Sequence, residues 1–137
     1  MIYLDTCVVA TLARRERETE ELFDWLDRHG DESLVSSVLL EVELERALRR
    51  VEPAALSRIP RLLSGISRVE ITATIRATAG AYQDPLLRSL DAIHLATAQT
   101  VAESAEKELS AFLTYDKRLI AAARGVGMHV EHPGARY

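Results

Sequence analysis

The sequence predicts an α/β protein, an α/β/α sandwich built around a central, mostly parallel sheet of four to five strands. Short apolar segments with strand character alternate with helical patterns along the chain, which is typical of a parallel sheet with helices on both faces. Two strand segments run directly into an aspartate, at Ile2-Tyr3-Leu4-Asp5 and at Phe112-Leu113-Thr114-Tyr115-Asp116. Because ligands bind beyond the carboxyl ends of parallel strands, we expect these two aspartates to meet at one edge of the sheet.

The individual elements follow from short patterns along the chain. Helical segments carry apolar residues at intervals of three and four, most clearly over 37–51. Helix ends are marked by His29-Gly30, Ser64-Gly65 and Gly125, and Pro53 marks a break. The apolar face of the 37–51 helix consists of Leu40, Leu44, Ala47, Leu48 and Val51. In order, we expect strands at 2–4, 34–35, 69–71, 111–115 and 128–130, and helices at 6–13, 20–28, 37–51, 54–64, 72–81, 91–101 and 117–124.

The composition fits one soluble domain over residues 1–137. An apolar content of 47% and a charged content of 28% are ordinary for a globular protein. No apolar stretch is long enough to span a bilayer, and the N-terminus runs into a strand and Asp5 rather than into a signal peptide. The single cysteine, Cys7, excludes an internal disulfide and indicates a reducing compartment. We therefore expect a cytoplasmic protein with no membrane partner.

The net charge of −4 argues against non-specific binding to nucleic acid, because affinity for phosphate backbones normally comes from clustered Lys and Arg. If several acids converge on one metal site, the remaining surface is closer to neutral than this total suggests. Charge alone therefore leaves the class of partner open.

Acidic residues on separate segments predict a metal site. Asp5 and Asp116 follow strands, and Asp91 opens a largely apolar helix, where a carboxylate costs free energy unless it is paired or bound to a metal. Carboxylate oxygens suit Mg²⁺ or Mn²⁺, which can polarise a phosphate and lower the pKa of a bound water. One cysteine and four scattered histidines argue against zinc. The acids therefore indicate a metal-dependent phosphodiesterase acting on RNA.

Each candidate also has a simpler interpretation. Asp5, Asp91 and Asp116 all stand at helix starts, where aspartate serves as an N-cap or complements the helix dipole. His94, one turn after Asp91, is interpreted as a satisfied core histidine. On the 37–51 helix, Glu41 and Glu43 flank the apolar face at nearly equal angles, so periodicity does not choose between them.

Four groups of residues together resemble a known family. In chain order they are Met1-Ile2-Tyr3-Leu4-Asp5-Thr6; Val35-Ser36-Ser37 with Val42-Glu43-Leu44 and Arg46-Ala47-Leu48-Arg49-Arg50; Leu87-Arg88-Ser89-Leu90-Asp91-Ala92-Ile93-His94-Leu95-Ala96; and Thr114-Tyr115-Asp116-Lys117-Arg118-Leu119. In this order, and over nearly the whole chain, they resemble a PIN domain and more narrowly the VapC toxins of bacterial toxin–antitoxin pairs.

The resemblance implies a PIN-like fold and a Mg²⁺-dependent endoribonuclease toxin that hydrolyses RNA with a metal-activated water. The implied catalytic and metal-binding residues are Asp5, Glu43, Asp91 and Asp116, and the implied substrate-positioning residues are Thr6, Thr114, Arg46, Arg50 and Arg88. Each arginine is equally well explained as a surface or salt-bridge residue. Cys7 stands where the family commonly has serine, which puts a phosphate-positioning role there in doubt.

The resemblance also implies partners. These are a cognate antitoxin that blocks the acidic site, a structured RNA such as tRNA or rRNA as substrate, and a second copy of the chain in a homodimer. Mn²⁺ is an alternative to Mg²⁺ as cofactor. The rival from another class is a catalytically inactive PIN-like module that binds RNA or protein without cutting.

Overall fold

The structure is a computed structural model that describes residues 1–104 and 106–137. Within these residues the chain forms a five-stranded sheet in the order β3-β2-β1-β4-β5, and every pairing is parallel. This confirms the predicted α/β class. The strands are β1 (Ile2–Leu4), β2 (Leu34–Ser37), β3 (Ile66–Val69), β4 (Ala111–Leu113) and β5 (Val130–Glu131).

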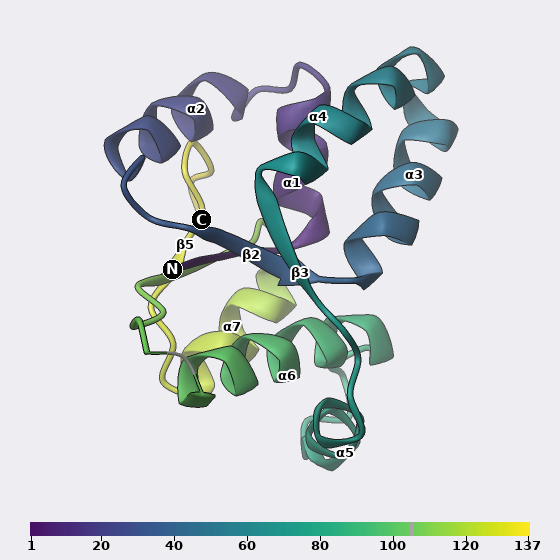
Figure 1. The fold of residues 1–137 in the computed structure, drawn as a ribbon. Coiled ribbons are helices and arrows are strands. Elements are labelled where there is room, and N and C mark those ends of the chain that lie inside the picture. The colour runs from purple at the N-terminus through teal and green to yellow at the C-terminus, as the bar shows by residue number, and fades with distance from the viewer. Residues whose placement is uncertain (105) are drawn as a thin grey trace.

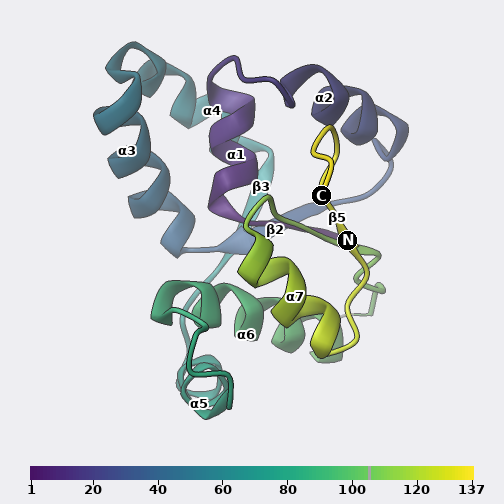
Figure 2. The ribbon, with the colours of Figure 1, turned by 180° about the vertical axis from the view of Figure 1, so that it is seen from behind.

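Helices cover both faces of the sheet, as expected for parallel strands. The first four helices lie on one face and the last three on the other (Figure 1), and the view from behind shows the same two layers (Figure 2). The helices are α1 (Thr6–Ala13), α2 (Thr19–Arg28), α3 (Leu39–Val51), α4 (Ile59–Ser64), α5 (Ala73–Ala81), α6 (Ser89–Ser104) and α7 (Lys117–Gly125), with a 3₁₀ segment η1 (Pro53–Arg58) before α4. In the described ranges, no helix combines the length and apolarity that a membrane crossing requires.

Alternation along the central strand creates two hydrophobic cores. Ile2 and Leu4 of β1 enter the core shared with α1 and α3, whereas Tyr3 enters the opposite core, shared with α6 and α7. The Tyr3 ring stacks on Phe112 of β4, with ring centroids 5.1 Å apart. All four side chains are fully buried, so β1 is fixed from both sides.

Some local predictions differ from the structure. The strand expected at 111–115 ends at Leu113, and the strand expected at 128–130 lies at Val130–Glu131. The expected helix over 54–64 divides into η1 and α4, because Pro60 has no N–H to continue an α-helical ladder and sits instead in the first turn of α4. The strand expected at 69–71 lies at Ile66–Val69, where it pairs with β2 in register from Leu34 to Ser37. Val51, assigned to the apolar face of α3, is 48% exposed at the end of that helix.

The strand order creates a switch point next to β1. The chain runs from β1 to β2 and β3 on one side, whereas β4 and β5 lie on the other. Such a reversal opens a crevice beyond the carboxyl ends of the two central strands. Leu4 pairs with Leu113, and the Asp5 N–H donates to the Leu113 carbonyl at 3.0 Å. The residues that follow β1 and β4 therefore meet in this crevice.

Candidate active site

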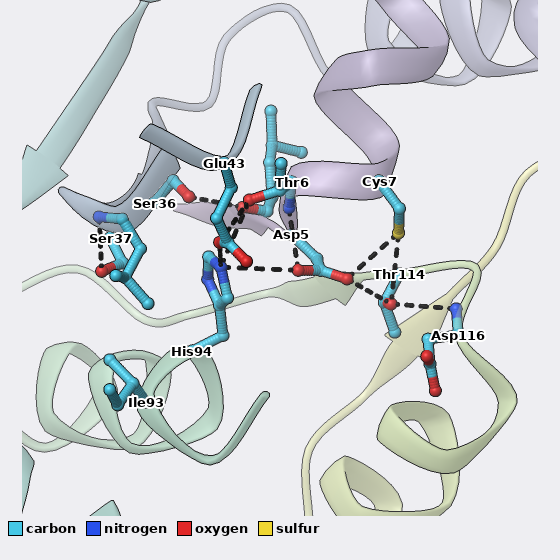
Figure 3. A network of polar contacts seen from close by, with 12 residues as sticks. Asp5, Thr6, Cys7, Ser36, Ser37, Glu43, Ile93, His94, Thr114 and Asp116 are labelled. Carbon is cyan, nitrogen blue, oxygen red and sulfur yellow. Dashed lines mark hydrogen bonds and ion pairs between the residues drawn. The ribbon is translucent and has the colours of Figure 1, made fainter. Parts of the chain in front are cut away.

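Asp5 is the buried centre of the polar cluster at the switch point (Figure 3). It is the N-cap of α1 and only 6% exposed. Its Oδ1 accepts a hydrogen bond from the Thr6 N–H at 2.8 Å. Its Oδ2 accepts from the Thr114 hydroxyl at 2.8 Å and from the Cys7 thiol at 3.0 Å. These three donors fix the orientation of the Asp5 carboxylate.

Glu43, rather than Glu41, faces this cluster from α3. Its Oε1 accepts from His94 Nε2 at 2.7 Å and from the Thr6 hydroxyl at 2.9 Å. Burial raises the pKa of Glu43, but the hydrogen bond and charge of His94 outweigh it, so the pKa lies below its ordinary value. Glu41 is exposed and pairs with Arg68 at 3.2 Å on the outer surface. The fold thus separates two glutamates that the helical pattern could not distinguish.

His94 is buried as expected, yet it is not a passive core residue. Its side chain is 1% exposed, and Nε2 lies 3.6 Å from Asp5 Oδ1 as well as 2.7 Å from Glu43 Oε1. On the other side of the ring, Nδ1 lies 2.7 Å from the Tyr3 hydroxyl. Burial would lower the pKa of His94, but the hydrogen bond to Glu43 and the charges of Asp5 and Glu43 together raise it. One ring therefore connects two acids to the buried strand β1.

Asp91 shows that the acids lie close enough to repel one another. It sits half-buried in the first turn of α6. Burial raises its pKa to about 6, and the negative charges of Asp5, Asp116 and Glu43 add to the shift. An aspartate held only as a helix cap would have its ionised form favoured instead. The raised pKa of Asp91 thus reflects its burial first and the nearby charges of acids from three other segments second.

Asp116 keeps its capping role within the same cluster. It is exposed, and its Oδ1 accepts from the N–H groups of Arg118 and Leu119 at 2.9 and 3.0 Å, which caps α7. Its own N–H donates to the Thr114 hydroxyl at 3.1 Å. Capping and membership of the acidic cluster are therefore compatible at this position.

The donor set fits a hard divalent cation, although it is not a closed cage. In the part of the chain that the structure describes, no three His, Cys, Asp or Glu side chains stand in a ready-made ion-binding arrangement. Burial first, and then the charges of Asp5, Asp116 and Glu43, raise the pKa of Asp91, and carboxylate oxygens are the ligands that Mg²⁺ and Mn²⁺ prefer. The residues that could hold such an ion are Asp5, Glu43, Asp91 and Asp116.

A groove of about 660 Å³ leads away from the cluster between α1 and α3. Thr6 and Glu43 line it near the acids, and Arg46 and Arg50 line it further along α3. Neither arginine forms an ion pair among the described residues, whereas the neighbouring Arg49 pairs with Glu45 at 2.9 Å. The groove is thus lined by three arginines, Arg14 among them, and by three glutamates, Glu16, Glu18 and Glu43, and within the described ranges its basic side chains on α3 are not paired with acids.

The remaining predicted site residues divide into two groups. The hydroxyls of Thr6 and Thr114 donate to acids of the cluster, so they orient carboxylates. Arg88 is exposed just before α6 and does not line the groove. The sequence did not point to Arg14, which lines the same groove and whose Nε is buried without a hydrogen bond among the described atoms.

Tyr3 also escaped the sequence-based prediction, although a signal was present. A tyrosine hydroxyl in a buried strand must find a polar partner. In the structure that partner is His94, whose Nδ1 lies 2.7 Å from the Tyr3 hydroxyl.

Fold and site together define a class of protein, an α/β domain whose acidic side chains gather at the switch point of a parallel sheet. The chain belongs to the PIN-domain family, whose model matches residues 2–125. Within that family it is a homologue of the VapC ribonucleases: it is 49% identical over 134 residues to Ribonuclease VapC35 of Mycobacterium tuberculosis, with 98% of each chain covered. The resemblance expected from the motifs is confirmed.

Solved structures share the fold at low sequence identity. VapBC2 from Rickettsia felis, crystallised with a promoter DNA fragment, superposes with a TM-score of 0.72 at 17% identity and covers 97% of this chain and 99% of its own. Mycobacterium tuberculosis VapC20, a toxin that cleaves the sarcin–ricin loop, gives a TM-score of 0.72 at 18% identity and covers 97% of this chain and 100% of its own. These matches confirm the PIN-like architecture.

Proposed function

We propose that this chain, as one PIN domain over residues 1–137, is a Mg²⁺-dependent endoribonuclease and the toxin of a VapBC-type toxin–antitoxin pair. The observation that carries the proposal is the contact of Asp5 and Glu43 with one buried ring at the switch point, where His94 Nε2 lies 3.6 Å from Asp5 Oδ1 and 2.7 Å from Glu43 Oε1. The charges of Asp5, Asp116 and Glu43 also help to raise the pKa of Asp91. Homology to Ribonuclease VapC35 over 98% of the chain supports ribonuclease activity. Mn²⁺ is an alternative cofactor.

The side chains of the cluster would have two roles, to hold the ion and to orient its ligands. Asp5, Asp91 and Asp116, with Glu43, would hold the ion, which when bound would polarise the scissile phosphate and lower the pKa of a water. The hydroxyls of Thr114 and Thr6 keep Asp5 and Glu43 oriented before any ion arrives. Pre-oriented ligands spare the site the entropic cost of ordering them during binding.

The groove beside the acids would receive the RNA backbone. Arg46 and Arg50 line it from the same helix that carries Glu43. Arginine binds phosphate through a fork of N–H donors, and backbone contacts of this kind position a nucleic acid without reading its sequence. The two arginines would therefore fix the strand so that one phosphate lies over the acids.

The structural relatives support the proposed partners. A toxin–antitoxin complex from Klebsiella pneumoniae shares the fold, and VapC20 is a toxin that cleaves the sarcin–ricin loop. By analogy, this chain would act in the cytoplasm on a structured tRNA or rRNA, form a homodimer and be blocked by a cognate antitoxin that covers the acidic site.

Cleavage mapping on total RNA tests the function directly. Purified protein with Mg²⁺ should produce discrete new RNA ends, and EDTA should abolish them because the acids cannot act without a cation. Calorimetry should show Mn²⁺ binding to the protein alone. RNA that is bound and remains intact in Mg²⁺ would overturn the ribonuclease and favour a binding module.

Replacing the groove arginines should weaken RNA binding while sparing the chemistry. In Arg46→Gln with Arg50→Gln, KM for RNA should rise by about 10-fold or more, and the salt slope of binding should fall by about 0.7 for each lost contact with a single strand. Arg49→Gln is the matched control, because Arg49 lies on the same helix but pairs with Glu45. Equal effects of the double variant and the control would contradict this path for the RNA.

The two glutamates of α3 should differ sharply in importance. Glu43→Gln removes a charged oxygen donor from the cluster and should reduce kcat by about 100-fold, as expected when an outer or direct ligand of a metal site is lost. Glu41→Gln changes only an exposed ion pair with Arg68, so its kcat should match wild type. Single-turnover cleavage of one RNA measures both, and equal rates would contradict the assignment of Glu43.

A further inference from the structure

The bonding pattern of Glu43 is asymmetric. Both of its donors, His94 Nε2 and the Thr6 hydroxyl, meet the same oxygen, Oε1. The other oxygen, Oε2, accepts no hydrogen bond from the described residues, and Figure 3 shows the Glu43 carboxylate pointing into the group formed by Asp5, Thr6 and His94. Glu43 is thus held by one oxygen and presents the other to the acidic cluster.

His94 is suited to hold that oxygen because its ring is fixed on every side. An ionised carboxylate can only accept, so Nε2 carries the proton that is shared with Glu43. Nδ1 meets the Tyr3 hydroxyl at 2.7 Å, and the two rings pack edge to face with centroids 5.9 Å apart. Tyr3 in turn stacks on Phe112. The imidazole is therefore anchored to β1 and β4 rather than to a mobile surface group.

We infer that His94 is a positioning residue of the acidic site: it clamps Glu43 Oε1, with Tyr3 as its support, so that Oε2 faces the place where Asp5 and its neighbours would share an ion. This inference rests on the proposed metal-dependent function. His94 is 1% exposed, so it is shielded from RNA and acts through the acids that it contacts, Glu43 first and Asp5 at 3.6 Å second. The arrangement follows the general rule that partners behind a metal ligand orient it and tune its affinity.

Three substitutions separate this role from the alternatives. His94→Gln keeps an N–H donor near the position of Nε2, whereas His94→Leu fills the core with no donor. Tyr3→Phe keeps both rings and removes only the hydroxyl behind Nδ1. Mn²⁺ binding to the metal-free proteins is measured by calorimetry, RNA cleavage gives kcat and KM, and thermal melting verifies the fold of each variant.

We expect His94→Leu to bind Mn²⁺ about 10- to 100-fold more weakly than wild type. His94→Gln should recover most of that lost affinity. The Mn²⁺ affinity of Tyr3→Phe should lie between those of His94→Leu and His94→Gln. The loss in cleavage should appear in kcat, with KM for RNA unchanged, because His94 makes no contact with the groove. If His94 only filled the core, His94→Leu would preserve Mn²⁺ affinity better than His94→Gln. If His94 only competed with the ion as a cation, both substitutions would tighten Mn²⁺ binding. Either order overturns the inference.

The design keeps the two proposals apart. Wild-type protein that binds Mn²⁺ but leaves RNA intact overturns the ribonuclease, and the order of Mn²⁺ affinities still decides the role of His94. Wild-type protein that binds no Mn²⁺ overturns both. If His94→Leu does not fold, Tyr3→Phe decides, and an unchanged Mn²⁺ affinity in that variant overturns the inference.

Discussion

Asp5→Asn should reduce Mg²⁺-dependent RNA cleavage to the background of a protein-free control. The substitution removes the charge of the most central acid, which is 6% exposed, while asparagine keeps an oxygen that can accept from the Thr6 N–H. The Thr114 hydroxyl can rotate to accept from the new amide, so the fold should persist. Gel-resolved cleavage with thermal melting of the same preparation measures both effects.

Two further variants complete this test. Asp116→Asn should also abolish cleavage, although Asp116 is exposed and caps α7, because its charge belongs to the same cluster. Asp24→Asn, at an exposed position on α2, is the matched control and should cleave like wild type. Full activity in Asp5→Asn with an intact fold would remove Asp5 from the catalytic machinery.

Asp91→Asn should have opposite effects on activity and on the stability of the metal-free protein. Cleavage should be lost with the charge. The folded-state pKa of Asp91 is about 6, above the value near 4 of an unfolded aspartate. Protonated Asp91 is thus favoured in the fold, and the stability that it contributes is complete below about pH 4 and is lost as the pH rises through 6.

The pH dependence of melting measures this effect. In EDTA at pH 7.5, Asp91→Asn should be more stable than wild type by on the order of 1 kcal/mol, allowing for solvent screening of a half-buried group, which is a few degrees in Tm. The difference should shrink toward zero at pH 4.5. Saturating Mg²⁺ should raise the Tm of wild type and leave the variant little changed. A variant that is less stable than wild type at pH 7.5 in EDTA would contradict repulsion at Asp91.

Lost cleavage together with higher stability in Asp91→Asn would show that the site keeps its acids for activity at the expense of folding stability. Four carboxylates at one sheet edge oppose folding through mutual repulsion, and the contacts of His94 with Glu43 and Asp5 offset part of it in the metal-free chain. Sites that bind charged ligands commonly sacrifice stability in this way.

The sequence alone determined the order of helices and strands and the placement of two acids of the site, Asp5 and Asp116. Apolar segments alternating with helical patterns predicted the parallel sheet, because those patterns are local consequences of burial on a strand or a helix. Asp5 and Asp116 could be placed for the same reason, since Asp5 directly follows β1, Asp116 lies three residues beyond the end of β4, and parallel strands end at a common edge. The helix over 6–13 was predicted with its observed limits.

Tertiary structure alone decided which side chains face one another. Glu43 and Glu41 flank the apolar stripe of α3 symmetrically, and only the docking of α3 beside β1 brings Glu43 against His94 and leaves Glu41 with Arg68. The role of His94 was hidden because its partners lie 91 and 51 residues away, at Tyr3 and Glu43. Periodicity reports which face of an element is buried, whereas the partners on that face are set by how distant segments pack.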